Sequence, residues 1–192
     1  MSMDYNVYLN ELDDENIPAW IAEMNKLGMV CEIHPAFSFK TQKGFLPFKI
    51  KVTDNSHDDL LNVEYLTGFE YYSDTFNLEE SIKPKKQSFF DKLLKRPKKK
   101  NYLYSKSIDE KLKACKYVIT FNFGVADTFE LRMASLASAT LSKITNGVCC
   151  YPSEGIWYDN ETIIENALKD VTAHEKTLKP RDFRLHKFEV WL

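Results

Sequence analysis

The sequence predicts an α+β fold, a two-layer sandwich in which helices lie on one face of a mostly antiparallel sheet. Runs of alternating apolar residues, typical of half-buried strands, occur between runs with the apolar spacing of amphipathic helices. The two halves of the chain share an outline, since each holds a strand, a helix and a following strand or hairpin. With 192 residues, 44% of them apolar, the chain is long enough for one substantial core. We therefore expect a single domain over residues 1–192.

The first half is predicted to contain one helix and four strands. An apolar stripe from Ile17 to Leu27 predicts a core-facing helix that ends at Gly28. Pro47 favours an edge position or a strand start, because proline has no amide hydrogen to donate. Residues 60–66 fit either a short helix or a strand. Apolar alternation places the four strands at residues 4–9, 29–34, 45–52 and 69–76.

The central stretch, residues 116–158, has the most consistent local signals. Alternation predicts a strand at Tyr117–Phe123. Asp127 and Glu130 have capping-box spacing, which predicts a helix that begins at Asp127. A carboxylate pair for acid–base or metal chemistry is the alternative interpretation of this spacing, and capping is the simpler one. Gly147 suits the left-handed residue that ends the helix.

The remaining elements are shorter. The expected ones are a hairpin (148–151 and 156–158), a helix capped by Ser107 and Glu110 that ends near Ala114, a helix from Asp159 to about Thr172, and a terminal strand at 183–191. The alternation of the terminal strand slips at His186–Lys187, which indicates a bulge.

A basic insertion, residues 83–100, interrupts an otherwise acidic chain. It holds nine basic residues and one acid, whereas the rest of the chain has 17 basic and 27 acidic residues. Three interpretations compete: a tethered surface segment whose apolar residues dock on the body, a site for an acidic protein or a membrane surface, and a nucleic-acid site, which the acidic body disfavours. The candidate binding residues of this insertion, which extends to about residue 101, are Lys85, Lys86, Phe89, Phe90, Lys95 and Arg96.

No motif for catalysis or cofactor binding occurs in the sequence. It lacks glycine-rich phosphate loops, a GxSxG nucleophile turn and an HExxH zinc motif. Cys149 and Cys150 are adjacent, so in a strand they point to opposite faces and cannot by themselves bind one zinc ion. We therefore expect no cofactor, no metal and no catalytic residue. An enzyme with an unrecognised pocket is the alternative, carried by His57, Asp59 and one of the cysteines.

The central stretch resembles a pattern in several uncharacterised bacterial families. In that pattern a hydrophobic strand precedes a small-residue helix, a glycine-containing turn, a short strand and a hairpin with proline, glycine and an aromatic residue. Some of these families resemble immunity proteins of bacterial toxin systems, which implies binding to another protein. The motifs are structural, so the resemblance transfers no site residue. In this sequence they lie at residues 117–123, 130–143, 145–148 and 152–157.

The sequence thus favours a small bacterial cytoplasmic binding protein, with another protein as its partner. Nucleic acid, a membrane surface and a second copy of the chain are the other partners that we consider. A cytoplasmic location is expected because no apolar run approaches the roughly 20 residues of a membrane span and the N-terminus lacks a signal pattern. Tyr and Trp are enriched in binding hot spots, although half-buried sheet aromatics are also common. The candidates around the 152–155 turn are Tyr151, Trp157 and Tyr158.

Overall fold

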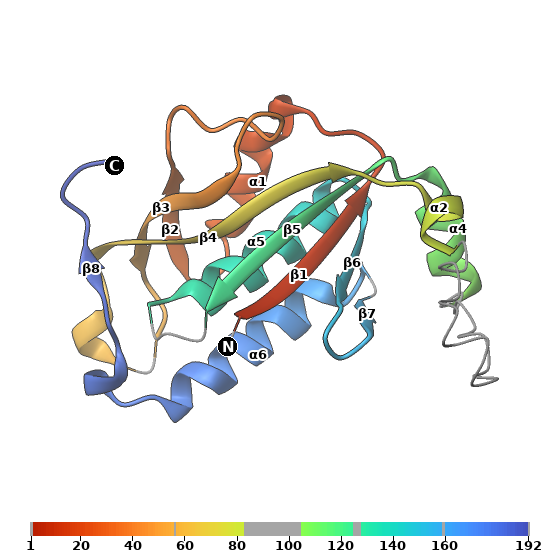
Figure 1. The fold of residues 1–192 in the computed structure, drawn as a ribbon. Helices are drawn as coiled ribbons and strands as arrows, with labels where there is room; N and C mark the ends of the chain where they lie inside the picture. Colours follow the sequence, from red (N-terminus) through yellow and green to blue (C-terminus); the bar gives the residue numbers. More distant parts are fainter. Residues whose placement is uncertain (1, 56, 83–104, 125–127, 159, 192) are drawn as a thin grey trace, which may run out of the picture.

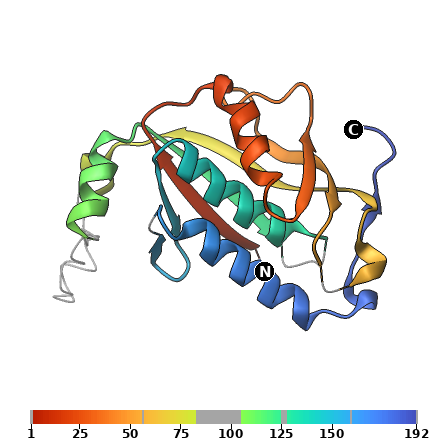
Figure 2. The same ribbon diagram turned by 180° about the vertical axis from the view of Figure 1, so that it is seen from behind.

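The computed structural model describes residues 2–55, 57–82, 105–124, 128–158 and 160–191. Within these residues the chain forms one antiparallel sheet, with helices over one of its faces (Figures 1 and 2). The predicted two-layer α+β sandwich is confirmed. Every prediction for the basic insertion falls outside the described residues.

The described part of the chain contributes eight strands to the sheet, and β5 and β1 lie near its middle. The order across the sheet is β2-β3-β4-β5-β1-β6-β7, and β8 pairs with the start of β4. All of these pairs are antiparallel. The bounds are β1 (Ser2–Leu9), β2 (Met29–Ile33), β3 (Gly44–Val52), β4 (Glu64–Thr75), β5 (Tyr117–Gly124), β6 (Val148–Tyr151), β7 (Ile156–Tyr158) and β8 (His186–Lys187).

Helix α5 lies across the middle of the sheet, between α1 and α6 on the same face (Figure 2). Helices α2 and α4 lie side by side at one end, beyond β4 and β5 (Figures 1 and 2). None of the described helices is long and apolar enough to cross a membrane. The helices are α1 (Ile17–Met24), α2 (Leu78–Ile82), α4 (Lys106–Ala114), α5 (Glu130–Ile144) and α6 (Ile163–Thr177), with 3-10 turns η1 (Asp14–Asn16), η2 (Asp58–Leu60) and η3 (Pro180–Asp182).

The core lies between α5 and the sheet, and Trp20 of α1 is its largest fully buried side chain. The indole Nε1 donates a hydrogen bond to the carbonyl oxygen of Ala137 in α5 (2.8 Å), which ties the two helices together. Ala137 belongs to a run of small residues in α5. These small side chains let the helix approach both the sheet and its neighbouring helices.

The start of α5 differs from the prediction. The helix begins at Glu130 rather than at Asp127, which lies outside the described residues. The Glu130 carboxylate accepts hydrogen bonds from the Gly124 amide (2.7 Å) and the Thr128 hydroxyl (2.9 Å). Its two oxygens therefore link Gly124, at the end of β5, to Thr128, two residues before α5.

The end of α5 differs too. Asn146, with φ of 49°, is the left-handed residue, and Gly147 is not. Gly147 is required for another reason, because a Cβ there would lie 2.5 Å from the carbonyl oxygen of Tyr8. The glycine lets β6 start against β1.

Other predicted boundaries are also wrong. Helix α4 starts two residues earlier than the predicted capping box, because the Ser105 hydroxyl accepts the Ile108 amide (3.2 Å). Helix α6 continues beyond Thr172 to Thr177. The terminal strand is confined to His186–Lys187, since only these two residues pair with β4.

Candidate functional site

The face of the sheet turned away from α1, α5 and α6, called the open face here, carries ordered polar side chains. Strand register places them in rows across β4, β5 and β1. No described helix covers these rows (Figure 1). The first row is Glu70, Asn122 and Asp4, the second is Tyr72, Thr120 and Asn6, and the third is Asp74, Val118 and Tyr8.

Hydrogen bonds hold the polar side chains of β5 and β1 in place. The Asn122 amide nitrogen donates to the Ser2 hydroxyl (2.6 Å) and to the Asp4 carboxylate. The Thr120 hydroxyl donates to Asn6 Oδ1 at 2.9 Å. Side chains fixed in this way lose little rotational freedom when a partner binds, which favours recognition.

Tyr72 of β4 is the most exposed aromatic side chain of these rows, with 43% of its surface accessible. Its hydroxyl donates to Glu70 Oε2 at 3.2 Å. This hydrogen bond and the Glu70 charge raise the pKa of Tyr72, so the phenol stays neutral. The open face therefore presents a flat, uncharged ring beside a carboxylate.

An aromatic cluster borders the rows on the side of β6 and β7. The Tyr8 ring lies 4.7 Å from the Phe76 ring and 5.7 Å from the Trp157 ring, between centroids. Trp157 is paired with Cys150, whose other neighbour is Asn6, so the indole belongs to the open face. The cluster extends the apolar contact area next to the carboxylates.

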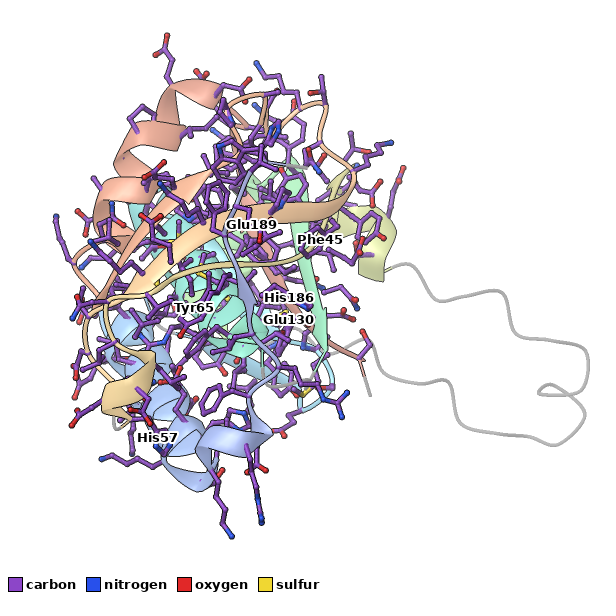
Figure 3. The ribbon with its side chains drawn as sticks, turned by 90° about the vertical axis from the view of Figure 1, so that its left-hand side faces the viewer. Phe45, His57, Tyr65, Glu130, His186 and Glu189 are labelled. Carbon is purple, nitrogen blue, oxygen red and sulfur yellow. The ribbon has the colours of Figure 1, made fainter. Side chains whose placement is uncertain are left out.

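Phe45 of β3 is also 43% exposed on this side of the sheet (Figure 3). Its ring has a structural function as well, because it covers the backbone of Gly68. A Cβ on Gly68 would lie 3.0 Å from Phe45 Cζ and 2.1 Å from the Leu46 carbonyl oxygen. An aromatic ring over a strand glycine compensates for the missing side chain.

The C-terminal tail covers the other end of the open face. Lys49 Nζ of β3 lies 5.3 Å from the Phe188 ring centroid, a cation–π contact. Trp191 lies with its ring 5.1 Å from that of Phe188 and 5.5 Å from that of His34. What stays uncovered by the described tail is the area over β1, β5 and the second half of β4.

A second feature lies on the helix side, where α5 and α6 meet two loops. Arg132 of α5 and Glu175 of α6 are each only 5% exposed and form a bidentate ion pair. Arg132 Nε donates to Glu175 Oε1 and Nη2 to Oε2, both at 2.7 Å. Nη2 also donates to the Asp54 carbonyl oxygen (3.1 Å), and Asn55 Nδ2 donates to Glu175 Oε2 (2.7 Å). The pair thus ties both helices to the loop after β3.

This ion pair lies at the floor of a surface hollow of about 380 Å³, called the Arg132 hollow here. Its size falls within the range of small-molecule sites, about 300–1,000 Å³. Four separate segments form it, namely the turn before β2, the loop after β3, α5 and α6. Apart from the ion pair, its charged and polar lining includes Lys26, Asp54, Asn55, Thr172 and Lys176.

The structure separates the three aromatic residues predicted around the 152–155 turn. Tyr151 and Tyr158 lie on the helix side, with rings 5.3 Å and 6.4 Å from that of Tyr5. Trp157 lies on the open face. The other predicted binding residues, in the insertion, are outside the described residues: Lys85, Lys86, Phe89, Phe90, Lys95 and Arg96.

The cysteines and His57 are not brought together. All four cysteines are free and buried, and burial raises the pKa of the Cys31 and Cys150 thiols to about 12. Cys149 and Cys150 point to opposite faces of β6, which confirms that prediction. His57 Nε2 instead lies 3.0 Å from the Leu178 carbonyl oxygen, near the end of α6 (Figure 3). Among the described residues, no three His, Cys, Asp or Glu side chains are grouped for metal binding.

Sequence reasoning missed both the polar rows and the Arg132 hollow. The sequence does indicate the polar rows, because polar residues alternate with apolar ones at Asn6, Thr120 and Asn122. It indicates the hollow only weakly, through an arginine inside the small-residue run of α5. No family model, curated protein or solved structure matches the chain.

Proposed function

We propose that this protein binds another protein through its open face, at the uncovered area over β1, β5 and the second half of β4. The observation that carries the proposal is the exposed Tyr72 ring, flanked by carboxylates and by polar side chains already held by hydrogen bonds. Such a mixture of an aromatic anchor and a satisfied polar surround is typical of protein interfaces.

The charges of the open face specify the partner's chemistry. Asp4 and Glu70 lie in the first row and Asp74 in the third. The five strands β1, β4, β5, β6 and β7 contain no lysine or arginine. A partner surface rich in Lys and Arg would pair with these carboxylates and place its side-chain stems over the Tyr72 ring. Nucleic acid is disfavoured on this face, because its phosphates would be repelled.

The experiment is affinity capture with tagged full-length protein from a lysate of the organism that makes it. Tyr72→Arg should abolish capture of a specific partner. Ile156→Arg is the matched control, because Ile156 is 40% exposed and its strand position points away from the open face. Equal capture by the two variants would contradict the proposal.

Two charge-reversal variants form a second matched pair for the capture experiment. Asp74→Lys, on the open face, should weaken capture, whereas Glu165→Lys, an exposed reversal on α6, should leave it unchanged. Capture by the unmodified protein should also weaken as the salt concentration rises, because surface ion pairs are screened. Capture that does not respond to Asp74→Lys or to salt would rule out a basic partner.

A narrower form of the proposal is an immunity-type protein that binds and neutralises a bacterial toxin. It is supported by the resemblance of residues 116–158 to uncharacterised bacterial families, some of them similar to immunity proteins. The test is co-expression with a toxin-like gene from the same genomic neighbourhood. The unmodified protein and Ile156→Arg should both restore growth, and Tyr72→Arg should not. Failure of the unmodified protein to restore growth would contradict this narrower form while leaving the open face testable by capture.

A further inference from the structure

The Arg132 side chain has hydrogen-bonding capacity that the protein leaves unused. An arginine has five N–H donors, and those on Nε and Nη2 are directed to Glu175 and the Asp54 carbonyl oxygen. Nη1 makes no hydrogen bond to any residue that the structure describes, yet no buried side-chain nitrogen or oxygen of those residues is left unsatisfied. Nη1 therefore reaches solvent through the Arg132 hollow, although the side chain as a whole is 95% buried.

Helix electrostatics give no reason for these two charges. Arg132 lies in the first turn of α5 and Glu175 in the last turn of α6. Each charge is at the less favourable helix end, since helix starts favour anions and helix ends favour cations. A buried ion pair also adds little stability compared with well-packed apolar side chains. The pair therefore calls for an explanation other than stability.

We propose that the Arg132 hollow binds a small oxyanion, a carboxylate or phosphate group, with Arg132 Nη1 as its central donor. Glu175 holds the guanidinium rigidly and leaves the two N–H groups of Nη1 free for charge-assisted hydrogen bonds to an oxyanion. Lys176, which also lines the hollow, contributes positive charge, whereas the charge of Lys26 is balanced by its ion pair with Glu23. The Asn55 side chain is already engaged by Glu175, so its part is to orient that carboxylate.

The Asp54 carboxylate is a negative charge close to the free donor of Arg132. A methyl group on Gly28 would lie 3.7 Å from Asp54 Oδ2 and 3.8 Å from Arg132 Nη1, so the two groups border the same small region. They do not form an ion pair with each other, and the Asp54 side chain is exposed. A bound oxyanion would meet repulsion from this carboxylate. Removing the Asp54 charge should therefore strengthen binding at an anion site and weaken it at a cation site.

The test is a two-dimensional NMR titration of the full-length protein with inorganic phosphate or with acetate, at an ionic strength kept constant with sodium chloride. We expect saturable shifts at the amides of Gly28 and Asn55 and at Arg132 Nε. Saturation by phosphate alone identifies a phosphate ligand, and saturation by acetate as well identifies carboxylate recognition. Shifts that rise linearly, or that spread over surface lysines, would overturn the proposal.

Two variants sharpen this test without removing the ion pair. Asp54→Asn should tighten binding about fivefold, the size of one unit-charge interaction at about 4 Å in water. Lys176→Ala should weaken binding by about the same factor, whereas Lys169→Ala, an exposed lysine of the same helix outside the hollow, should not change it. Weaker binding by Asp54→Asn, or equal effects of the two lysine variants, would overturn the assignment. Because these outcomes do not involve the open face, they are independent of the proposed partner.

Discussion

The two faces of the sheet are built from alternate residues of the same strands, yet their chemistry is opposite. On β5, Ile119 and Phe121 are fully buried against the helices. Thr120, between them, lies on the open face and donates a hydrogen bond to Asn6. The covered face is therefore a core, and the open face is a polar surface that satisfies its own hydrogen bonds.

This difference separates stability from recognition. Helices exclude any partner from the covered face, so its side chains contribute to folding. The open face does not need a partner for the chain to fold, because its side chains bond to one another. Substitutions of core residues on the covered face should thus destabilise the protein strongly, whereas substitutions of the exposed residues in the polar rows should change binding and leave stability nearly unaltered.

The largest expected effect comes from Trp20 on the covered side. Trp20→Ala should lower the free energy of unfolding by about 3–5 kcal/mol, because it leaves a cavity and removes the hydrogen bond from the indole to the Ala137 carbonyl oxygen. Tyr72→Ala, on the open face, should cost less than about 1 kcal/mol. Urea denaturation followed by circular dichroism gives both values. Similar losses of unfolding free energy for the two variants would contradict the division of the sheet into a stabilising face and a binding face.

The buried ion pair should behave like part of the covered side. Glu175→Ala leaves Arg132 as an uncompensated buried charge, which costs about 3–5 kcal/mol. Replacing both residues, Arg132→Met with Glu175→Leu, should recover most of that loss, because apolar side chains of similar size often replace such pairs. Thermal and urea unfolding of the single and double variants provide the comparison. A double variant as unstable as the single one would show that the pair itself stabilises the fold.

Alkaline pH should destabilise the protein through groups buried on both sides of the sheet. Burial raises the pKa of the Cys31 and Cys150 thiols and of the Tyr5 phenol to about 12. The folded state favours their neutral forms, whereas the unfolded chain ionises them at lower pH. The free energy of unfolding should therefore fall from about pH 9 towards pH 12, by up to about 1.4 kcal/mol per pH unit for each group.

Urea denaturation at a series of pH values measures this dependence. Cys31→Ala removes one of the three groups, so the slope above pH 9 should become smaller. An unchanged slope for this variant would mean that the Cys31 thiol is not responsible for the alkaline loss.

The smallest effect is expected for an ion pair on the open side of the sheet. Lys49 Nζ lies 2.6 Å from Glu32 Oε1, and more than half of the Glu32 side chain is exposed. Glu32→Ala should change stability by no more than about 1 kcal/mol, because water screens exposed pairs. High salt should reduce even that difference. A loss as large as that of Glu175→Ala would show that exposure does not set the strength of these pairs.

The amino-acid sequence predicts the layers of this fold because local periodicity decides them. Alternation at Tyr5, Val7 and Leu9 identified β1, and the apolar stripe around Trp20 identified α1. Helix starts were harder to predict. Glu130 has the spacing of a capping box, but its carboxylate bonds to Gly124 across the connection, a contact that depends on where β5 ends.

The candidate site was less predictable, since it combines residues from distant parts of the chain. Tyr72, Asn122 and Asp4 meet only because β4, β5 and β1 are neighbours in the sheet. Arg132 and Glu175 are 43 residues apart and pair because α5 and α6 lie side by side. Strand order and helix pairing are decided by tertiary packing, which local patterns do not encode.

Site-specific photo-cross-linking tests the central claim most directly, namely that the open face is the binding surface. A benzophenone amino acid would replace either Tyr72 or Ile156 of the full-length protein in living cells of its own organism. We predict a cross-linked species heavier than the 22.4 kDa chain from position 72, none from position 156, and loss of the position 72 product when Asp74→Lys is added. A product from position 156 with none from position 72 would contradict the claim.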